Sequence, residues 1–423
     1  MGASSRGLFS RSLGGPARAL RRPSRGSQSR SRQLAAELLE RRYALAATPT
    51  ATVAGPVLSG LIGQDIPLTV SFDNTGTDIG YSPFVDIVMP ATGDAPPTPN
   101  DGISFMPGSA SYNGLSLVTT VLTFDAAGNA THPFAKKPDG TPVIVTGKAG
   151  DQLVVVQLPF GSYVPDQPAA VINFTGSVSP LAQPNQPLFV TATGGFQYQV
   201  DGSGNPTINV ADFGSKSTDP VQPQLFRIKK TSTAPEGETA TGPNFTHSYT
   251  VSIAVAPGQT VTDMLLSDVL PNNLQFVSVT TVSGNGTTTI TPVSTPTTST
   301  PGGTLSRRLD QVVGTGKASD AVMTFTYFVP EKDASNADVI PLGTGGTAVA
   351  VNTSSAEGKW TSANPNFPDE QTVTSSPTDP DSKHTLTAKT TALQKTVADL
   401  THPGSPRAGD TLEYTLNFQV SDY

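Results

Sequence analysis

The amino-acid sequence predicts an all-β protein made of β-sandwiches in tandem, preceded by a basic leader. Short runs of β-branched and aromatic residues alternate with Gly-, Asn- and Asp-rich turn signals from residue 48 onward. No long helical pattern interrupts this series. The same strand motifs recur at fixed distances along the 423 residues. Many short strands joined by frequent turns are typical of sandwiches.

The first 47 residues differ from the rest of the chain in charge and composition. They carry ten Arg and two Glu, a net charge of +8, which leaves −15 for the rest of a chain whose total is −7. Residues 1–32 are rich in Arg, Ser and Gly without apolar periodicity, so we expect them to be disordered. Residues 33–45 place Leu among charged residues, which predicts a short amphipathic helix.

The end of this leader has features of an export signal. Ala44–Ala47 supplies small residues at which a signal peptidase cuts. The stretch Glu37–Ala47 (ELLERRYALAA) resembles the LEPR-XLL leader of giant planctomycete surface proteins, with Arg41 where that family usually has Pro or Asp. The resemblance implies export, and hence an extracellular or cell-surface location. A mitochondrial transit peptide and a disordered basic arm are the alternatives.

The composition excludes several kinds of chemistry. The chain has no Cys, which removes disulfides, Cys-ligated zinc and cysteine nucleophiles. Its four His are far apart in the sequence, which argues against a His-rich metal site. The acidic body disfavours nucleic acid, and no apolar run approaches the roughly 18 residues that a membrane-spanning helix needs. We therefore expect no enzyme, no cofactor, no nucleic-acid partner and no membrane span.

Recurring residues predict three copies of one unit. Lys230-Thr231 recurs as Lys395-Thr396 and Tyr249-Thr250 recurs as Tyr414-Thr415, both at an offset of 165. An earlier copy has Leu68 at 181 residues before Tyr249. The predicted units are residues 48–222 with an insert, 223–390 and 391–423. The counterpart of Pro271 in the third unit would fall at 436, so we expect the chain to be the N-terminal fragment of a longer polypeptide.

The second and third units resemble a known family. The segments Asp263–Val279 and Ala350–Ser354, together with Leu393–Asp399 and Ala408–Tyr414, are similar to the "conserved repeat domain" of large bacterial cell-surface proteins. The resemblance implies an Ig-like sandwich fold arrayed in tandem, which serves as a stalk or adhesive module. It lends no catalytic residue.

One set of residues in the second unit points to covalent self-linkage. Lys230 and Lys395 lie on the predicted first strands of their units. In some surface sandwiches a buried Lys at this place condenses with an Asn of the last strand, assisted by a protonated acid. Asn352 is the candidate partner, with Asp263 or Asp268 as the acid. An isopeptide bond would suit a cysteine-free protein because it needs no oxidant. The alternative is a Lys whose ammonium reaches water at the edge of the sandwich.

The same comparison excludes this chemistry in the first unit. The spacing of 19 residues between Lys230 and Tyr249, applied to Leu68, falls on Pro49. Proline has no side-chain amine, so we expect no such bond there.

An acidic stretch follows in the second unit. Asp369, Glu370, Asp379 and Asp381 offer the carboxylate oxygens that calcium prefers. The regular Asp-x-Asp-x-Asp-Gly loop with a closing Glu is missing, so a solvated acidic linker is the alternative reading.

These observations lead to one functional hypothesis and two alternatives. We expect a non-catalytic structural or adhesive module of an exported surface protein, a stalk with weak polyvalent contacts to protein or glycan ligands. The first alternative is a dedicated carbohydrate- or protein-binding module that uses the insert at residues 91–150, with Phe105, Tyr112 and Phe134 either as stacking residues or as part of the core. The second is an accessory region of a secreted enzyme whose catalytic domain lies beyond residue 423.

Overall fold

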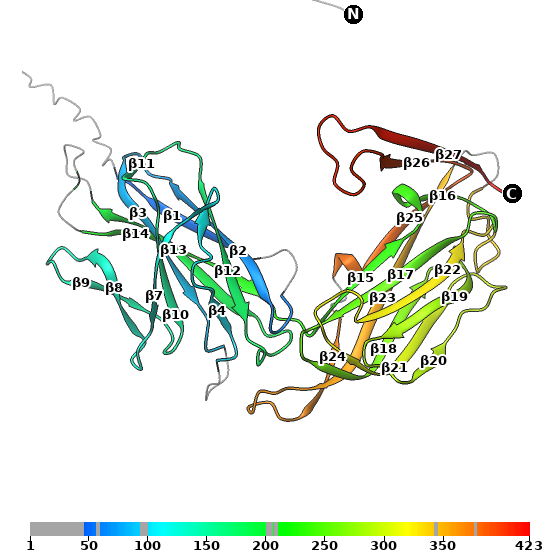
Figure 1. Cartoon of the computed structure of the whole chain (residues 1–423), viewed down its shortest axis with the longest axis horizontal. Helices are drawn as coiled ribbons and strands as arrows, with labels where there is room; N and C mark the ends of the chain where they lie inside the picture. The colour runs from blue at the N-terminus through cyan, green and yellow to red at the C-terminus, as the bar shows by residue number, and fades with distance from the viewer. Residues whose placement is uncertain are drawn as a thin grey trace, which may run out of the picture. The chain divides into compact units, whose positions relative to one another are not determined.

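The structure, a computed structural model, describes residues 46–55, 60–93, 100–199, 206, 210–341, 346–375 and 379–423. Apart from Ala46 and Ala47, the predicted leader, with its disorder and its short helix, lies outside the described residues. In the described part, the regular elements are strands and two short 3-10 helices, Pro235–Gly237 and Pro380–Ser382 (Figure 1). The predicted all-β class is therefore confirmed.

Two sheets form the first sandwich. One has the order β1-β2-β12-β5-β6, with β4 paired to β12, and the other has the order β14-β13-β3-β10-β7, with β11 paired to β3. The bounds of the first sheet are β1 Pro49–Ala54, β2 Asp65–Asn74, β4 Ile103–Phe105, β5 Ser111–Tyr112, β6 Leu115–Ser116 and β12 Ala170–Val178. Those of the second are β3 Gly80–Met89, β7 Val118–Thr123, β10 Gln152–Gln157, β11 Ser162–Tyr163, β13 Leu188–Tyr198 and β14 Asp212–Val221.

The predicted insert of this sandwich contains a separate hairpin, β8 (Asn129–Lys136) and β9 (Pro142–Thr146). The hairpin contributes to a small second core that includes Phe84 and Phe213.

Within the main core, the alternation of buried and exposed residues along β2 gives the strand one apolar face, formed by Ile66, Leu68, Val70 and Phe72.

Two further sheets form the second sandwich. One has the order β15-β17-β22-β19 and the other β16-β25-β23-β18-β21-β20, with β24 paired to β23. The bounds of the first are β15 Phe226–Ser232, β17 His247–Val255, β19 Gln275–Gly284 and β22 Ala321–Phe328. Those of the second are β16 Glu238–Ala240, β18 Thr260–Leu270, β20 Ile290–Ser294, β21 Gly303–Val313, β23 Thr347–Thr361, β24 Glu370–Thr374 and β25 Lys383–Lys389. Strict alternation on β22 buries Ala321, Met323, Phe325 and Tyr327 and leaves the residues between them half-buried.

The last described element is a two-stranded antiparallel hairpin, β26 (Thr391–Asp399) and β27 (Leu412–Val420), drawn in dark red in Figure 1. The predicted unit boundaries at residues 48, 223 and 391 stay predictions. The two sandwiches share a pattern of strand pairing. In the first, β2 pairs with β12 and β3 with β13; in the second, β17 pairs with β22 and β18 with β23.

Candidate functional site: a buried lysine, aspartate and asparagine

The sandwich brings together three residues that are far apart in the sequence. Lys230 lies on β15, in one sheet, whereas Asp268 and Asn352 lie on the neighbouring strands β18 and β23 of the other sheet. Asp268 is directly opposite Ser354 on β23. Asn352 lies two residues before Ser354 and therefore on the same face of that strand. All three point inward because they occupy the buried positions of alternating strands. The two sheets therefore meet at this polar cluster.

The contacts within the cluster are incomplete. The Lys230 ammonium is in direct contact with the Asp268 carboxylate, and both side chains are fully buried. The other carboxylate oxygen, Asp268 Oδ1, and both polar atoms of the Asn352 side chain have no hydrogen-bond partner of good geometry among the described residues. Asn352 is 0% exposed. Unpaired buried polar atoms each cost about 1–3 kcal/mol. This arrangement therefore destabilises the sandwich, and such unpaired groups in a folded protein call for an explanation.

Aromatic rings line the cluster on the side of Lys230. The Lys230 Nζ lies 4.3 Å from the centre of the Tyr249 ring and 5.5 Å from that of Phe325. Tyr327 stacks on Tyr249 with ring centres 4.1 Å apart and planes at 11°. The Tyr249 hydroxyl and His384 Nδ1 are 3.3 Å apart. The rings hold the amine in an apolar place and favour its position through their electron-rich faces.

Burial shifts the two ionisable groups toward their neutral forms. Desolvation lowers the pKa of the Lys230 ammonium, and the nearby Asp268 carboxylate opposes part of that shift. Desolvation likewise raises the pKa of the Asp268 carboxyl, against the opposing effects of Lys230 and of the Asn352 side chain. Both pKa shifts favour the neutral amine of Lys230 and the neutral carboxylic acid of Asp268. These are the protonation states in which the amine is a nucleophile and the acid is a donor.

The structure distinguishes the two acids that the sequence offered. Asp263 lies on the outer face of β18, where its side chain is 42% exposed and pairs with Arg308 Nη1 at 2.6 Å. Lys359 Nζ is 3.9 Å from its other oxygen. Asp263 is therefore not the acid of this cluster, and Asp268 is.

Asn352 also differs from its expected place. It lies on β23, which two further strands, β24 and β25, follow in the sequence, so it is not on the last strand of the unit. The aromatic residues and His384 were not anticipated. The signal for them was present, because the alternation of residues 247–255 and 321–328 points Tyr249, Phe325 and Tyr327 toward the same interior as Lys230.

The strand register also corrects the residue that replaces Lys230 in the first sandwich. Lys230 is opposite Val251 on β17, and the residue 181 positions before Val251 is Val70 on β2. Val70 is opposite Val53, which is 4% exposed. Val53 and not Pro49 therefore occupies the lysine position, and the expectation that the first sandwich lacks the amine is unchanged.

The predicted calcium residues do not form a cluster. The Asp379 carboxylate accepts a hydrogen bond from the backbone N–H of Asp381 and caps the short helix Pro380–Ser382. Glu370 faces Lys359 at 3.8 Å. In the residues that the structure describes, no group of three or more His, Asp or Glu side chains is placed to hold a metal ion. Calcium at this stretch stays a prediction without geometric support.

The aromatic residues of the insert take part in packing. Phe105 is buried at 3% exposure, and Tyr112 packs against Phe160 with ring centres 5.3 Å apart. Phe134 packs edge-on against Phe84 at 5.2 Å. Phe105 is therefore a core residue, the alternative that the sequence left open, whereas stacking of the half-buried Tyr112 and Phe134 on a ligand stays a prediction.

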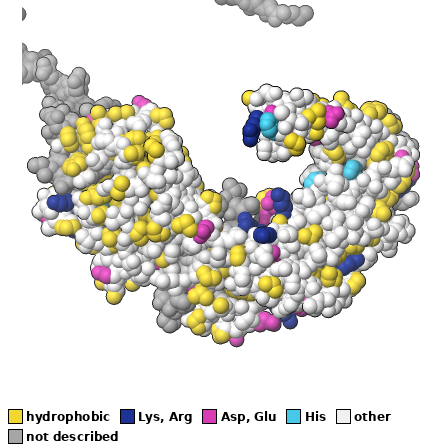
Figure 2. Space-filling model, viewed as in Figure 1, with side chains coloured by type: hydrophobic (Ala, Val, Ile, Leu, Met, Phe, Trp, Pro, Cys, Tyr) yellow, Lys and Arg dark blue, Asp and Glu magenta, His cyan; other side chains and the backbone are white. Residues whose placement is uncertain are grey.

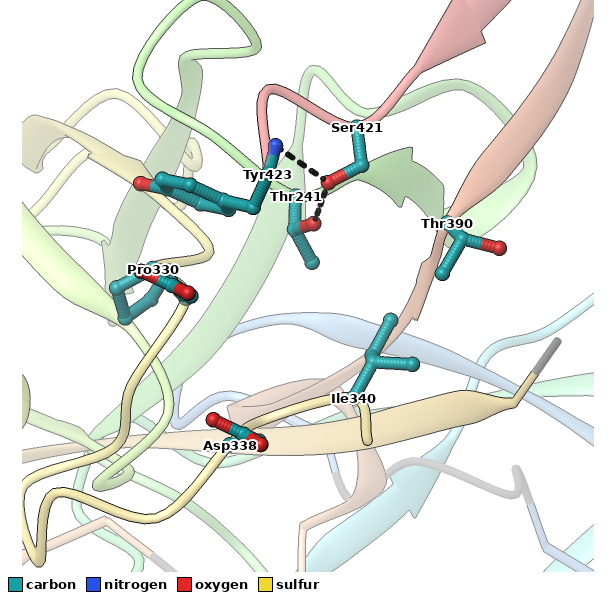
Figure 3. Close-up of a pocket in the computed structure, with 8 residues that line it drawn as sticks. Thr241, Pro330, Asp338, Ile340, Thr390, Ser421 and Tyr423 are labelled. Carbon is teal, nitrogen blue, oxygen red and sulfur yellow. Dashed lines mark hydrogen bonds between the residues drawn. The ribbon is translucent and has the colours of Figure 1, made fainter. Parts of the chain in front are cut away.

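The second sandwich has a pocket of about 320 Å³ beside Arg227 on β15, which both basic and acidic side chains line. A smaller pocket, between Thr241, Ile340 and Ser421, has a volume of about 30 Å³ and has room for water molecules only (Figure 3). Its polar atoms are engaged locally, since the hydroxyls of Thr241 and Ser421 are 2.6 Å apart and the Ser421 hydroxyl accepts a bond from the N–H of Tyr423. Figure 2 shows a mostly uncharged face on which acidic and basic side chains are scattered singly or in small groups. Across the described residues, no helix has the length and apolarity to cross a membrane.

Comparison with known proteins gives distant likenesses only. No protein-family model matches the chain, and no curated protein matches it. Among solved structures, the full-length major pilin SpaD from Corynebacterium diphtheriae is 13% identical over 77% of this chain and 65% of its own, with a TM-score of 0.24. The major pilin subunit BcpA of Bacillus cereus is 10% identical over 81% of this chain and 85% of its own, with a TM-score of 0.22.

A third solved structure comes from a surface protein. The collagen-binding domain of the Erysipelothrix rhusiopathiae surface protein RspB is 14% identical over 81% of this chain and 97% of its own, with a TM-score of 0.18. Scores this low carry no argument for function.

Proposed function

We propose that the chain is a structural module of an exported bacterial surface protein, and that its second sandwich staples itself with an amide bond between Lys230 and Asn352. One observation carries the staple: Lys230, Asp268 and Asn352 are buried together from three strands, with polar atoms left unpaired. A purely structural ion pair would have its remaining lone pairs satisfied by other groups.

The chemistry requires only groups that the cluster contains. The lone pair of the neutral Lys230 amine attacks Cγ of Asn352, while protonated Asp268 donates to the side-chain oxygen Oδ1 and stabilises the charge that develops there. The attacking nitrogen then loses a proton to the Asp268 carboxylate, and the departing nitrogen of Asn352 gains one. A C–N bond forms, a C–N bond breaks, and one ammonia leaves. No electrons are transferred, and Asp268 ends in its starting state.

The position of the bond explains what it would do. It connects β15 in one sheet to β23 in the other, so the two sheets could no longer separate. The linkage closes a loop of about 120 residues, and the chain-entropy estimate for cross-links of that size is roughly 5 kcal/mol. Such a covalent brace suits a stalk that must bear load without disulfides in a chain that has no Cys.

Support for the surface location comes from the leader and the repeats. Residues 37–47 resemble the leader of planctomycete surface proteins, and residues 225–423 resemble a tandem repeat of cell-surface proteins. In this role the chain acts as a spacer, with protein or glycan contacts that become strong through repetition.

Mass spectrometry of the full chain tests the staple. We expect the purified chain to weigh about 17 Da less than its sequence, the mass of one ammonia, and a digest to contain a branched peptide joining Lys230 to Asn352. The matched control is Lys230→Arg, which keeps the cation but lacks the nucleophilic amine and should show the full sequence mass. A wild-type chain of full mass, with separate Lys230 and Asn352 peptides, would overturn the proposal.

A further inference from the structure

The hairpin β26–β27 repeats the strand pair β15–β17 residue by residue. Adding the offset of 165 to the bounds of β17 gives the bounds of β27, and adding it to the start of β15 gives the start of β26. The pairing is also the same, since Lys230 is opposite Val251 and Lys395 is opposite Leu416 at the matching place. The hairpin thus repeats two of the four strands of the sheet that presents the nucleophile.

The lysine environment is repeated as well. Lys395 Nζ lies 4.4 Å from the centre of the Tyr414 ring, compared with 4.3 Å between Lys230 Nζ and the Tyr249 ring. Each Lys sits on the strand next to its Tyr and reaches over the ring from the same side of the hairpin. This arrangement arises within the hairpin itself, before any other sheet contributes to it.

The two copies differ in what covers the face that carries the Lys. In the second sandwich, Ile228, Lys230, Tyr249, Val251 and Ile253 are all buried. In the hairpin, the matching positions are exposed: Leu393 by 53%, Tyr414 by 54%, Leu416 by 61% and Phe418 by 70%, with Lys395 also exposed.

The opposite face of the hairpin is the one that is anchored. Gln394 is only 3% exposed and donates to the backbone carbonyl of Glu238 at 2.9 Å. The side-chain oxygen of Gln419 accepts from the backbone N–H of Ala240 at 3.0 Å. The hairpin therefore uses its polar face for local attachment and leaves the apolar face available. A row of large apolar residues with this regularity marks a surface for another protein segment.

We infer that this face is an acceptor for a β-sheet that carries a buried Asp and a buried Asn at the positions of Asp268 and Asn352, and that Lys395 forms an amide bond with that Asn. The inference rests on the proposed reaction of Lys230. The internal repeat identifies the occupant, because in the second sandwich Lys230 of the same Lys-over-Tyr pair contacts Asp268 on β18, and its strand β15 contacts β23. The arriving sheet would remove the amine from water, as at Lys230, and supply the acid and the amide. The new bond would again release one ammonia.

A graft within the full chain tests this inference with the known Asp268 and Asn352 sheet as the probe. Residues 226–255 are replaced by a copy of residues 391–420, which has the same length and the same strand register. We expect the copied Lys395 to bond with Asn352, so that the chimera weighs about 17 Da less than its sequence and yields the corresponding branched peptide. The matched control is the same chimera with the copied Lys changed to Arg, which should keep its full mass.

A second, smaller graft covers the case in which the chimera does not fold. It changes only inward-facing residues to those of the hairpin, Phe226→Thr, Ile228→Leu, Val251→Leu and Ile253→Phe, and leaves the loops and Lys230 in place. Bond formation in this variant at the wild-type extent supports the inference.

The outcomes separate the two proposals. A parent chain that is linked, with a folded chimera and a folded small graft that are not, overturns this inference alone. A parent chain of full mass overturns the Lys230 proposal and this one with it. Dimers of the full chain that Phe418→Lys dissociates would show that a second copy occupies the face, which also overturns the inference.

Discussion

The two sandwiches place different residues at three equivalent positions. The first has Val53, Ile87 and Val190 where the second has Lys230, Asp268 and Asn352. The equivalence follows from the register: Ile87 is opposite Ala192 as Asp268 is opposite Ser354, and Val190 and Asn352 each lie two residues before those partners. The aliphatic residues are all buried, at 4%, 0% and 0% exposure.

This difference shows that the fold does not need the polar residues. Three aliphatic side chains complete the same core in the first sandwich without any desolvated charge. Replacing a buried ion pair by apolar residues is often neutral or stabilising by about 1–4 kcal/mol, so we expect the second sandwich to be no more stable before linkage than an apolar version. A covalent bond between the residues would add stability that the ion pair does not supply. The comparison therefore favours a chemical role for the cluster over a structural one.

The first sandwich has a buried ion pair of its own, which behaves differently. Asp86 Oδ1 and His132 Nε2 are 3.2 Å apart beneath the insert hairpin, on the face of β3 opposite to Ile87. His132 Nδ1 accepts from the backbone N–H of Ala135 at 2.8 Å, so both ring nitrogens are used. This pair is satisfied by ordinary hydrogen bonds, whereas the cluster in the second sandwich is not.

The largest effect is expected from Asp268→Ala. It removes the acid, so no bond forms, and it leaves Lys230 buried without its partner. Breaking a buried pair costs about 3–5 kcal/mol, and the missing cross-link adds roughly 5 kcal/mol more. Thermal unfolding followed by calorimetry should show the second sandwich melting far earlier, with the intact mass at its full value. Asp268→Ala with wild-type mass and melting temperature would contradict the assignment of the acid.

A smaller loss is expected when the second sandwich is given the residues of the first. The triple variant Lys230→Val, Asp268→Ile, Asn352→Val loses the cross-link, about 5 kcal/mol in the chain-entropy model, but carries no unpaired buried group. It should therefore fold, show its full mass and melt at a temperature above that of Asp268→Ala. If the triple variant melts below the single variant, the two sets of positions are not equivalent.

Much of this site was predictable from the sequence, and the exceptions have physical causes. The motif at Lys230 and the apolar run around Asn352 identified two members, because both lie in strongly alternating strands. The choice between Asp263 and Asp268 was also available in principle: Met264, Leu266 and Asp268 share one face, and a residue at odd spacing from them points outward. A β-bulge between Thr262 and Leu265 interrupts the register near Asp263 and obscures that rule.

Other features required the structure. The spacing that pointed to Pro49 assumed equal connections, but the connection between β1 and β2 is shorter than the one between β15 and β17. Connections vary in length more freely than strands do, so a distance in sequence does not transfer between repeats. The juxtaposition of β18 with β23, and of both with β15, depends on long-range pairing that no local pattern encodes.

The pair in the first sandwich gives a pH test of the same comparison. Burial raises the pKa of Asp86, and the interactions with His132 oppose part of the rise. A carboxyl whose pKa is higher in the folded state stabilises the fold below the unfolded value of 3.8, and that contribution is lost as the pH rises through the folded pKa. In the wild type, the free energy of unfolding of the first sandwich should therefore fall as the pH rises from 3.8 through the folded pKa of Asp86. We expect Asp86→Asn to make this fall smaller. Denaturant unfolding of both proteins between pH 4 and about 7 measures it, and parallel curves would contradict the prediction.

The smallest effect is expected from Asp263→Asn, the matched control for Asp268. Asp263 has a φ of 55°, a conformation that Asn tolerates well, so the change tests charge without adding backbone strain. Its partners Arg308 and Lys359 are 39% and 47% exposed, and ion pairs of this kind contribute about 0–1 kcal/mol. The variant should keep the loss of one ammonia and nearly the wild-type melting temperature. If Asp263→Asn instead abolishes the linkage, the acid that assists the reaction lies outside the core. The difference between Ile87 and Asp268 would then not explain why one sandwich links and the other does not.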